Sequence, residues 1–178
     1  MKTKRYYVEE KIVEAVIDLL KDHSLDDITV QALCEKAGVG RASFYRHYQN
    51  KEQILKDHAQ SLIQEWTRDF ESSAHEQPSD VFVSLFTHLK DNQEFYEILH
   101  STGWDHILKD TIRYKLGVTP ELSNLDAYQK VFFADGMTGW IEEWIERGMQ
   151  ESPDELNTLL GDYFINILSN LKAFYTAS

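Results

Sequence analysis

The sequence predicts an all-α protein of about nine helices, in which a small N-terminal helical domain precedes a larger one. Apolar residues recur at spacings of three and four along most of the chain, as they do on one face of a helix. Three prolines and eight glycines in 178 residues leave room for long helices. No segment alternates apolar and polar residues as a half-buried strand does. Since 42% of the residues are hydrophobic, the chain can bury one or two small cores.

Three helices are expected in the N-terminal part of the chain. An apolar stripe predicts the first helix over about 6–23. Thr29 can cap the second helix with its side-chain oxygen. Gly38 follows the second helix, at a position where a left-handed residue commonly ends a helix. The third helix is very short and is expected over 41–47.

The later helices are longer, and two of them begin with clear capping signals. Asn50 and Gln53 can form a capping box that starts a helix ending near residue 74. The stretch 77–79, Gln-Pro-Ser, is the clearest boundary in the chain. Ser152 and Pro153 begin the last helix with a cap and a proline in the first turn. The remaining helices are expected over 79–90, 91–100, 103–116 and 122–147.

Charge is distributed unevenly along the chain, whose net charge is -12. Residues 1–60 hold ten Lys/Arg and ten Asp/Glu, whereas residues 61–178 hold eight and twenty. A neutral head on an acidic body fits a domain that contacts DNA, and random scatter in an acidic protein is the alternative. The single cysteine excludes an intramolecular disulfide. Because no window suits a signal peptide or a membrane span, we expect a cytoplasmic protein without a membrane partner.

Residues 38–51 combine a tight turn, a short helix rich in hydrogen-bond donors and the start of another helix. This order is typical of a helix-turn-helix, in which small residues let two helices cross closely. Val39 and Phe44 can fill the core between the helices. The outward face then carries Arg41, Ala42, Ser43, Arg46 and His47.

Several donors in this segment suit contacts with DNA. Tyr45, His47 and Tyr48 carry aromatic donors for phosphate, and Lys51 stands at a helix start that already favours an anion. Arginine at position 41 can read a guanine edge or clamp phosphate. Core packing is the alternative for the two tyrosines, and a solvated surface charge is the alternative for Lys51 and Arg41.

The span 29–55, TVQALCEKAGVGRASFYRHYQNKEQIL, resembles the DNA-binding signature of the TetR family of transcriptional regulators. The resemblance covers about residues 6–58, with a weaker match along 130–160. It implies phosphate contacts from Thr29, Tyr45, His47 and Lys51. It implies base or phosphate contacts from Arg41, Ala42 and Ser43.

Two positions depart from the family pattern. Gly40 stands where the family caps the third helix with Ser or Thr, which costs about a few tenths of a kcal/mol and removes a hydroxyl. Arg46 stands where an aromatic residue or histidine is common in the family, and its guanidinium can add a contact to the DNA backbone. The resemblance divides the chain into a helix-turn-helix DNA-binding domain, 1–50, and an effector-binding and dimerisation domain, 51–178. The helix over 51–75 connects the two.

The helix over 122–147 has apolar residues around almost its whole circumference, so we expect one side to face its own subunit and the other a partner. Together with the last helix it can form a four-helix bundle with a second copy. The resemblance implies a homodimer of this kind, which reads a palindromic operator in double-stranded DNA through half-sites about 34 Å apart. The expected interface residues are Gly136, Gly139, Trp140, Trp144, Leu160, Phe164, Ile167 and Leu171.

The family resemblance also implies a small-molecule effector pocket in the body of the protein. Its expected lining is Trp66, Phe70, Phe86, Tyr96, Trp104, Tyr128, Phe132 and Asp135. The alternative is that these aromatic residues only fill a helical core. Asp135 can anchor a ligand or form a hydrogen bond across the dimer.

We therefore expect a DNA-binding regulator, a repressor relieved by an unknown effector, although activation remains open. A second hypothesis is a related protein that acts through a protein partner. An enzyme is not expected, because the chain lacks a metal-binding motif, a serine elbow, a glycine-rich phosphate loop and a Cys-His pairing. Neither a cofactor nor a metal is expected.

Overall fold

The computed structural model describes residues 4–73 and 80–163, with side chains described from Tyr7 onward. Within these ranges the chain forms helices and no strands, which confirms the predicted all-α class. The helices are α1 (Lys4–Leu20), α2 (Val30–Ala37), α3 (Arg41–His47), α4 (Lys51–Glu71), α5 (Asp80–Asp91), α6 (Gln93–Ser101), α7 (His106–Lys115) and α8 (Asn124–Glu146). Residues 153–163 are also helical. No helix in the described part is both long and apolar enough to cross a membrane.

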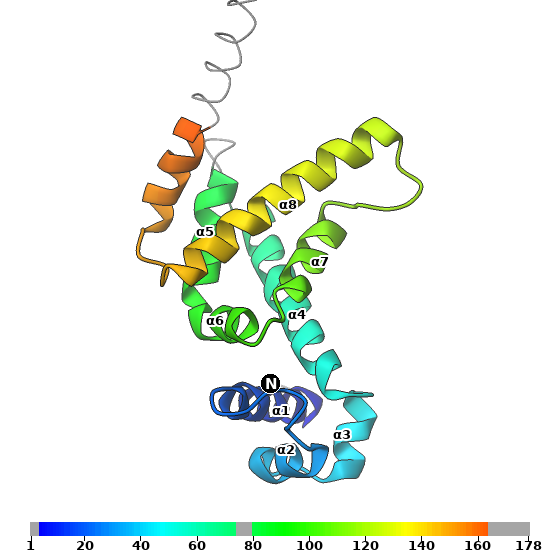
Figure 1. The fold of residues 1–178 in the computed structure, drawn as a ribbon. Helices are drawn as coiled ribbons and strands as arrows, with labels where there is room; N and C mark the ends of the chain where they lie inside the picture. The colour runs from blue at the N-terminus through cyan, green and yellow to red at the C-terminus, as the bar shows by residue number, and fades with distance from the viewer. Residues whose placement is uncertain (1–3, 74–79, 164–178) are drawn as a thin grey trace, which may run out of the picture.

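The chain folds into two parts joined by α4 (Figure 1). We call α1, α2 and α3 the head, and the helices from α5 onward the body. The head has a core to which each of its helices contributes: Ile12, Val16, Leu33 and Phe44 are completely buried. Burying a large apolar side chain contributes about 1.5–3 kcal/mol. Because α1 packs on both α2 and α3, this shared core fixes the orientation of α3.

The helix α4 belongs to both parts. It packs on α1 at one end and on α5 and α7 further along. The ring of His58, in its middle, meets Phe95 of α6 edge-on, with ring centroids 4.7 Å apart. Burial lowers the pKa of His58 to about 4, so the ring is neutral at pH 7. Lys21, just beyond α1, forms a 2.6 Å ion pair with Glu94 of α6, so the head also contacts the body directly.

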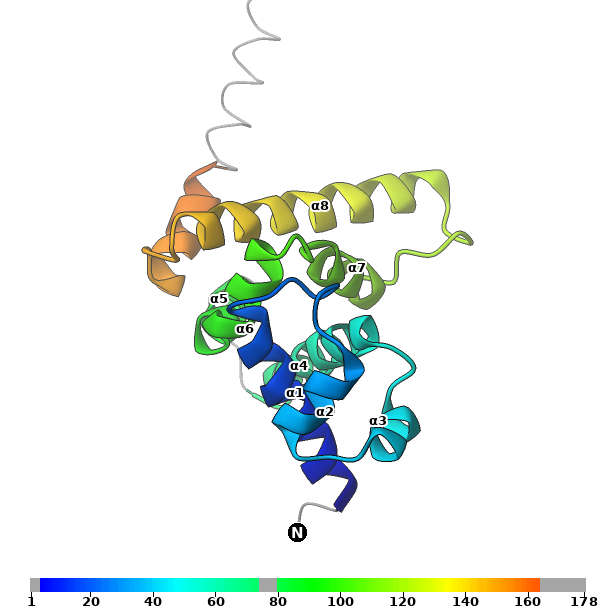
Figure 2. The same ribbon diagram turned by 60° about the horizontal axis from the view of Figure 1, so that its bottom comes forward.

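The helix α8 lies across the body and packs on α6 and α7 (Figure 2). Its inner face includes Ala134 and Ile141, which are completely buried. Its outer face includes Phe132, which is 78% exposed. The apolar residues around its circumference thus serve two surfaces, one inside this chain and one facing out.

The predicted helix ends differ from the observed ones mainly by a few residues. The third helix has the predicted bounds, whereas α1 ends at Leu20 and α4 ends at Glu71. Asn50 caps α4 by accepting from the Gln53 N–H at 2.8 Å. The Gln53 side chain accepts from the N–H of Gln49 rather than of Asn50, so the box is shifted by one residue. The last helix, which begins after Ser152 as expected, is described as far as residue 163.

Candidate nucleic-acid interface

The turn between α2 and α3 depends on Gly38. Its φ of 65° lies in the left-handed region, and its N–H donates to the Glu35 carbonyl. The next N–H, of Val39, donates to the Cys34 carbonyl at 2.9 Å. No atom would crowd a Cβ at position 38, so glycine is needed here for backbone conformation rather than for space. The turn ends α2 and leads within three residues into α3.

The helix α3 has one buried anchor and an exposed face. Phe44 is completely buried, and Tyr45 lies edge-on against it with ring centroids 5.2 Å apart. Tyr45 is still 61% exposed, so most of its side chain is on the surface. Arg41 and Ala42 are exposed at the start of the helix. Among the described residues, Arg41 has no hydrogen bond or ion pair, so its guanidinium is available to a ligand.

Arg46 continues this exposed face toward the end of α3. Its Nε donates to the Ala42 carbonyl at 3.2 Å, which holds the side chain along the helix. Only one of the five guanidinium N–H groups is used in this way. Ser43 is half-buried beside it. The arrangement leaves two guanidinium groups and a phenol on one short helix, a donor set suited to phosphates and base edges.

His47 and Tyr48 are less exposed than we expected, because both contact other residues of the head. The Nδ1 atom of His47 lies 3.1 Å from Oε1 of Glu9 in α1, and the side chain of His47 is only 12% exposed. Tyr48 is 6% exposed and packs against Phe44, with centroids 6.0 Å apart. Burial raises the pKa of Tyr48 to about 12. The ring of Tyr48 thus follows the core-packing alternative, and both residues fasten α3 to α1 and the core.

Thr29 and Lys51 also have structural partners. Thr29 is exposed and caps α2 by accepting from the Ala32 N–H at 3.1 Å. The Lys51 ammonium donates to three carbonyls between α1 and α2: those of Leu25 and Ile28 at 2.5 Å and that of Asp26 at 3.3 Å. An ammonium has three N–H donors, so all of them are used inside the head. In this arrangement the side chain ties the start of α4 to the loop, and a phosphate contact from Lys51 stays a prediction.

The eight residues expected to line one effector pocket do not come together. Trp66 and Phe70 stack at 5.9 Å and line an open groove of about 450 Å³ between α4 and α5. Phe86 and Tyr96 are 0% and 1% exposed, so they are core residues. Trp104 lines a different groove, beside the start of α4.

The other three expected pocket residues all lie on α8. Tyr128 and Phe132 are 69% and 78% exposed and point away from the body core. Asp135 accepts from Arg113 at 2.8 Å and also pairs with Lys109 at 3.2 Å, both on α7. The Arg113 hydrogen bonds, followed by that from Lys109, hold the pKa of Asp135 below its usual value. Asp135 therefore joins α7 to α8 within one chain.

The outer face of α8 carries a continuous exposed stripe at helical spacing. We call Leu125, Tyr128, Phe132, Gly136 and Gly139 the outer stripe; the large side chains are 64–78% exposed. A Cβ added at either glycine would meet no heavy atom within 4 Å, so the surface there is open to a partner.

The remaining residues expected at the interface are distributed differently. Trp144 and Leu160 are 3% and 4% exposed, so they are buried within the chain rather than available on its surface. Trp140 is half-buried and meets Tyr163 edge-on at 5.8 Å. Phe164, Ile167 and Leu171 lie outside the described residues.

Sequence reasoning missed one ionic cluster in the body, which we call the His100 clamp. Nδ1 of His100 lies 2.7 Å from Asp105, and Nε2 lies 2.7 Å from Glu146 at the end of α8. Both ring nitrogens can donate only in the imidazolium form, and these hydrogen bonds raise the pKa of His100, with Glu146 the larger cause. The described residues contain no cluster of His, Cys, Asp and Glu arranged to hold a metal ion. The clamp joins α6, the start of α7 and α8.

Comparison with known proteins gives matches along most of the chain. The family model described as "Bacterial regulatory proteins, tetR family" matches residues 12–57. The family model described as "Transcriptional regulator C-terminal region" matches residues 76–166, just over half of the 178 residues. The uncharacterized HTH-type transcriptional regulator YxbF of Bacillus subtilis (strain 168) is 23% identical over 181 residues, which cover 94% of this chain and 46% of YxbF. This chain thus spans about half the length of that curated relative.

Solved structures share the fold. The structure of Lin0861 from Listeria innocua has a TM-score of 0.78 at 16% identity, covering 94% of each chain. The dihydroxyacetone kinase operon activator DhaS has a TM-score of 0.61 at 20% identity, covering 91% of this chain and 96% of its own. The fatty acid degradation regulator FadR from Bacillus halodurans has a TM-score of 0.60 at 13% identity, covering 89% and 93%. With both domains matched in order, the chain belongs to the TetR family of bacterial regulatory proteins.

Proposed function

We propose that this protein is a homodimeric transcriptional repressor that binds a palindromic operator through α3 and releases it when a small molecule binds the body. The observation that carries the proposal is the exposed face of α3, where Arg41, Tyr45 and Arg46 surround the buried anchor Phe44. A donor-rich face on a rigidly packed helix is what major-groove recognition requires.

Within this proposal the residues have different tasks. Arg41 and Ala42, at the exposed start of α3, read base edges. Tyr45 and Arg46 contact phosphates, and the exposed cap residue Thr29 supplies a further phosphate contact. Phosphate contacts set the position of the head on the duplex, whereas base contacts set its sequence preference.

Dimerisation supplies the second head. The outer stripe is the surface that supports it, because three large apolar side chains lie exposed in one row and two glycines allow a second helix to approach closely. Two heads related by a twofold axis read two half-sites about one helical turn, roughly 34 Å, apart. A palindromic operator follows from this symmetry.

The groove beside Trp66 and Phe70 supports an effector site. Its volume of about 450 Å³ lies within the range of small-molecule sites. Trp66 Nε1 donates to Ser84 at 2.9 Å, which fixes the indole as one wall. An effector releases DNA only if it binds the DNA-free arrangement of the heads more tightly than the DNA-bound one.

A mobility-shift experiment with DNA from upstream of the gene tests the proposal. The wild-type protein is expected to retard a fragment with an inverted repeat, and Arg41→Ala to weaken that binding by about 1–3 kcal/mol. Arg147→Ala, which removes an exposed arginine at the end of α8, is the matched control and should bind as the wild type does. A reporter repressed by the wild type supports repression, whereas stimulation would indicate activation, as the name of DhaS states for that protein. Binding equally strong in Arg41→Ala would contradict the assignment.

The second candidate is a protein that acts through a protein partner. The exposed outer stripe is compatible with contact to a second copy of this chain and also with contact to a different protein. A chain that forms no homodimer and shifts no duplex, yet retains the fold, would favour this candidate.

A further inference from the structure

The ring of His47 lies at the end of α3, where it contacts α1. Its Nδ1 atom is 3.1 Å from Oε1 of Glu9. An ionised carboxylate only accepts hydrogen bonds, so the shared proton is on Nδ1. A neutral imidazole carries one N–H, which leaves Nε2 as a bare acceptor. Glu9 therefore decides which nitrogen of His47 holds the first proton.

The other ring nitrogen of His47 reaches the surface. Nε2 has no hydrogen-bond partner in the described part of the chain. In that part, the buried side-chain atom that lacks a partner is Nε1 of Trp144, so Nε2 of His47 is in contact with solvent. The ring is thus held at one nitrogen and open to a ligand at the other, although only 12% of the side chain is exposed.

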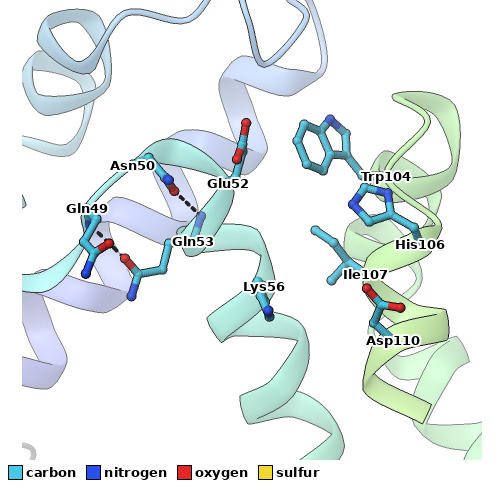
Figure 3. Close-up of a pocket in the computed structure, with 9 residues that line it drawn as sticks. All are labelled: Gln49, Asn50, Glu52, Gln53, Lys56, Trp104, His106, Ile107 and Asp110. Carbon is cyan, nitrogen blue, oxygen red and sulfur yellow. Dashed lines mark hydrogen bonds between the residues drawn. The ribbon is translucent and has the colours of Figure 1, made fainter. Parts of the chain in front are cut away.

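The chain that follows His47 is fixed as well. Gln49 donates its N–H to the Gln53 side chain at 2.8 Å, and the Asn50 side chain accepts from the Gln53 N–H at 2.8 Å (Figure 3). These bonds form a rigid corner between α3 and α4. Together with the contact to Glu9, they position the ring before any ligand binds, which lowers the cost of ordering on binding.

The place of the ring favours a DNA phosphate as the ligand of Nε2. Tyr45 and Arg46, just before His47, are the exposed donors that the proposed function assigns to phosphates. A helix in the major groove has phosphates along both sides, so a group on the flank of α3 meets the backbone rather than base edges. A phosphate oxygen only accepts hydrogen bonds, so this contact needs a second proton on the ring, at Nε2.

Glu9 is the charged group that acts most directly on this second proton. Charged side chains on the elements around the ring include Glu9 and Glu10 of α1, Glu35 and Lys36 of α2, Arg46 of α3 and Asp57 of α4. Among the described residues, Glu9 is the charged group within hydrogen-bond distance of the ring. Glu35 accepts from Gln31, and Lys36 pairs with Asp18, so both have partners elsewhere.

We propose that Glu9 is a positioning residue for DNA binding: it orients His47 and stabilises the doubly protonated ring, whose Nε2–H donates to a phosphate. Each head then takes up one proton when it binds the operator. Because the bound state holds the extra proton, operator affinity falls as the pH rises. This inference rests on the proposed DNA-binding function and adds proton uptake to it.

Fluorescence anisotropy of an operator duplex at pH 6, 7 and 8, at constant ionic strength, measures the proton uptake. Wild-type affinity should fall by about tenfold per head, or about a hundredfold for a dimer, between pH 6 and pH 8. The salt dependence should be shallower at pH 8 by about two units of slope, because two cations are lost. The affinity of His47→Gln should depend little on pH.

The variant Glu9→Gln separates the proposal from general electrostatics. Removing a carboxylate near DNA ordinarily strengthens binding, because the protein becomes less negative. The proposal expects the opposite: Glu9→Gln should weaken binding by about threefold to tenfold at pH 7 and move the pH profile to lower pH. A variant that was only less stable would lose affinity equally at each pH. Glu10→Gln removes the neighbouring exposed carboxylate and, as the matched control, should keep the wild-type profile.

Nitrogen-15 spectra of the imidazole rings observe the proton itself. The chain has seven histidines, and His47→Gln identifies the His47 signals. The operator complex should show both ring nitrogens protonated at a pH where the free protein shows only Nδ1 protonated. If DNA binds with an affinity independent of pH, or if Glu9→Gln keeps the wild-type profile, the inference is wrong and the proposed function stands. If no duplex binds, the proposed function fails, and the inference fails with it.

Discussion

Replacing Lys51 with methionine tests whether this side chain holds the head together or holds DNA. Its ammonium donates to the carbonyls of Leu25, Asp26 and Ile28, so it joins the first turn of α4 to the loop between α1 and α2. Methionine keeps most of the aliphatic stem and removes the three donors. The expected consequence is a less stable head whose DNA-binding face is unchanged.

The magnitude follows from the surroundings of the three carbonyls. The contacts to Leu25 and Ile28 are partly buried, and the contact to Asp26 is exposed, so water replaces the ammonium most easily at Asp26. A hydrogen bond to a charged group contributes about 1.5–3 kcal/mol, and the three share one ammonium and do not add fully. We expect Lys51→Met to lower the free energy of unfolding by roughly 2–4 kcal/mol, or to lower Tm by about 4–16 °C for a chain of this length.

Urea unfolding followed by circular dichroism measures this loss, and Lys56→Met is the matched control. Lys56 lies five residues further along α4 and is exposed, so its replacement should change stability by less than about 0.5 kcal/mol. Operator binding at a temperature where both variants are folded completes the assay. If Lys51→Met leaves stability unchanged but lowers the salt slope of DNA binding by about one unit, the lysine binds phosphate and the structural role is refuted.

Three further predictions concern the turn, the His100 clamp and the outer stripe. Gly38→Ala should lower the free energy of unfolding by about 1–2 kcal/mol, because the φ of 65° at this position is unfavourable for a residue with a Cβ. Gly40→Ser, at an ordinary φ of -76°, should leave the free energy of unfolding unchanged or raise it by about a few tenths of a kcal/mol. Urea unfolding measures both changes. The pKa of His100 in the folded protein is raised above 6.5, so its contribution to the free energy of unfolding is complete below pH 6.5 and is lost as the pH rises through the folded pKa. The free energy of unfolding should therefore fall from pH 6.5 upward, and His100→Gln should flatten its dependence on pH. His58 and His88, whose pKa values are lowered by burial, act in the opposite sense and below pH 6.5, so a flat wild-type curve above that pH would contradict the clamp. Phe132→Glu should give a monomer in analytical ultracentrifugation, and Tyr114→Glu, an equally exposed tyrosine on α7, should leave the dimer intact; a dimer in both would exclude the outer stripe.

The helical fold could be predicted from the sequence because local signals decide it. Capping residues such as Thr29 and Asn50 lie at the starts of α2 and α4, and their side chains accept from the expected turn. Gly38 has the left-handed backbone that its position after α2 predicted. Apolar spacing identified the buried face of each helix in the head, including Phe44 as the completely buried residue of α3.

The site depends on contacts between distant residues, which local patterns do not contain. Lys51 looked like a free cation at a helix start, and its partners lie 23–26 residues earlier in the chain. His47 pairs with Glu9, 38 residues away. Spacing along α8 placed Tyr128 and Phe132 among apolar residues, but it could not tell which side of the helix the body covers. That choice depends on how α6 and α7 pack, and it moved both residues from an expected pocket to the outer face.

The most direct test of the central claim, that the exposed face of α3 binds operator DNA, is a fluorescence-anisotropy titration of an operator duplex across a series of salt concentrations. If the dimer contacts roughly six to ten phosphates, the logarithm of the affinity should fall with the logarithm of salt concentration, with a slope of about -5 to -9. Tyr45→Phe and Arg46→Ala should each lower affinity for all duplexes, with a smaller slope for Arg46→Ala, whereas Arg41→Ala should change the preference between duplexes. Binding to no duplex, or salt-dependent binding that all three variants retain, would contradict the account.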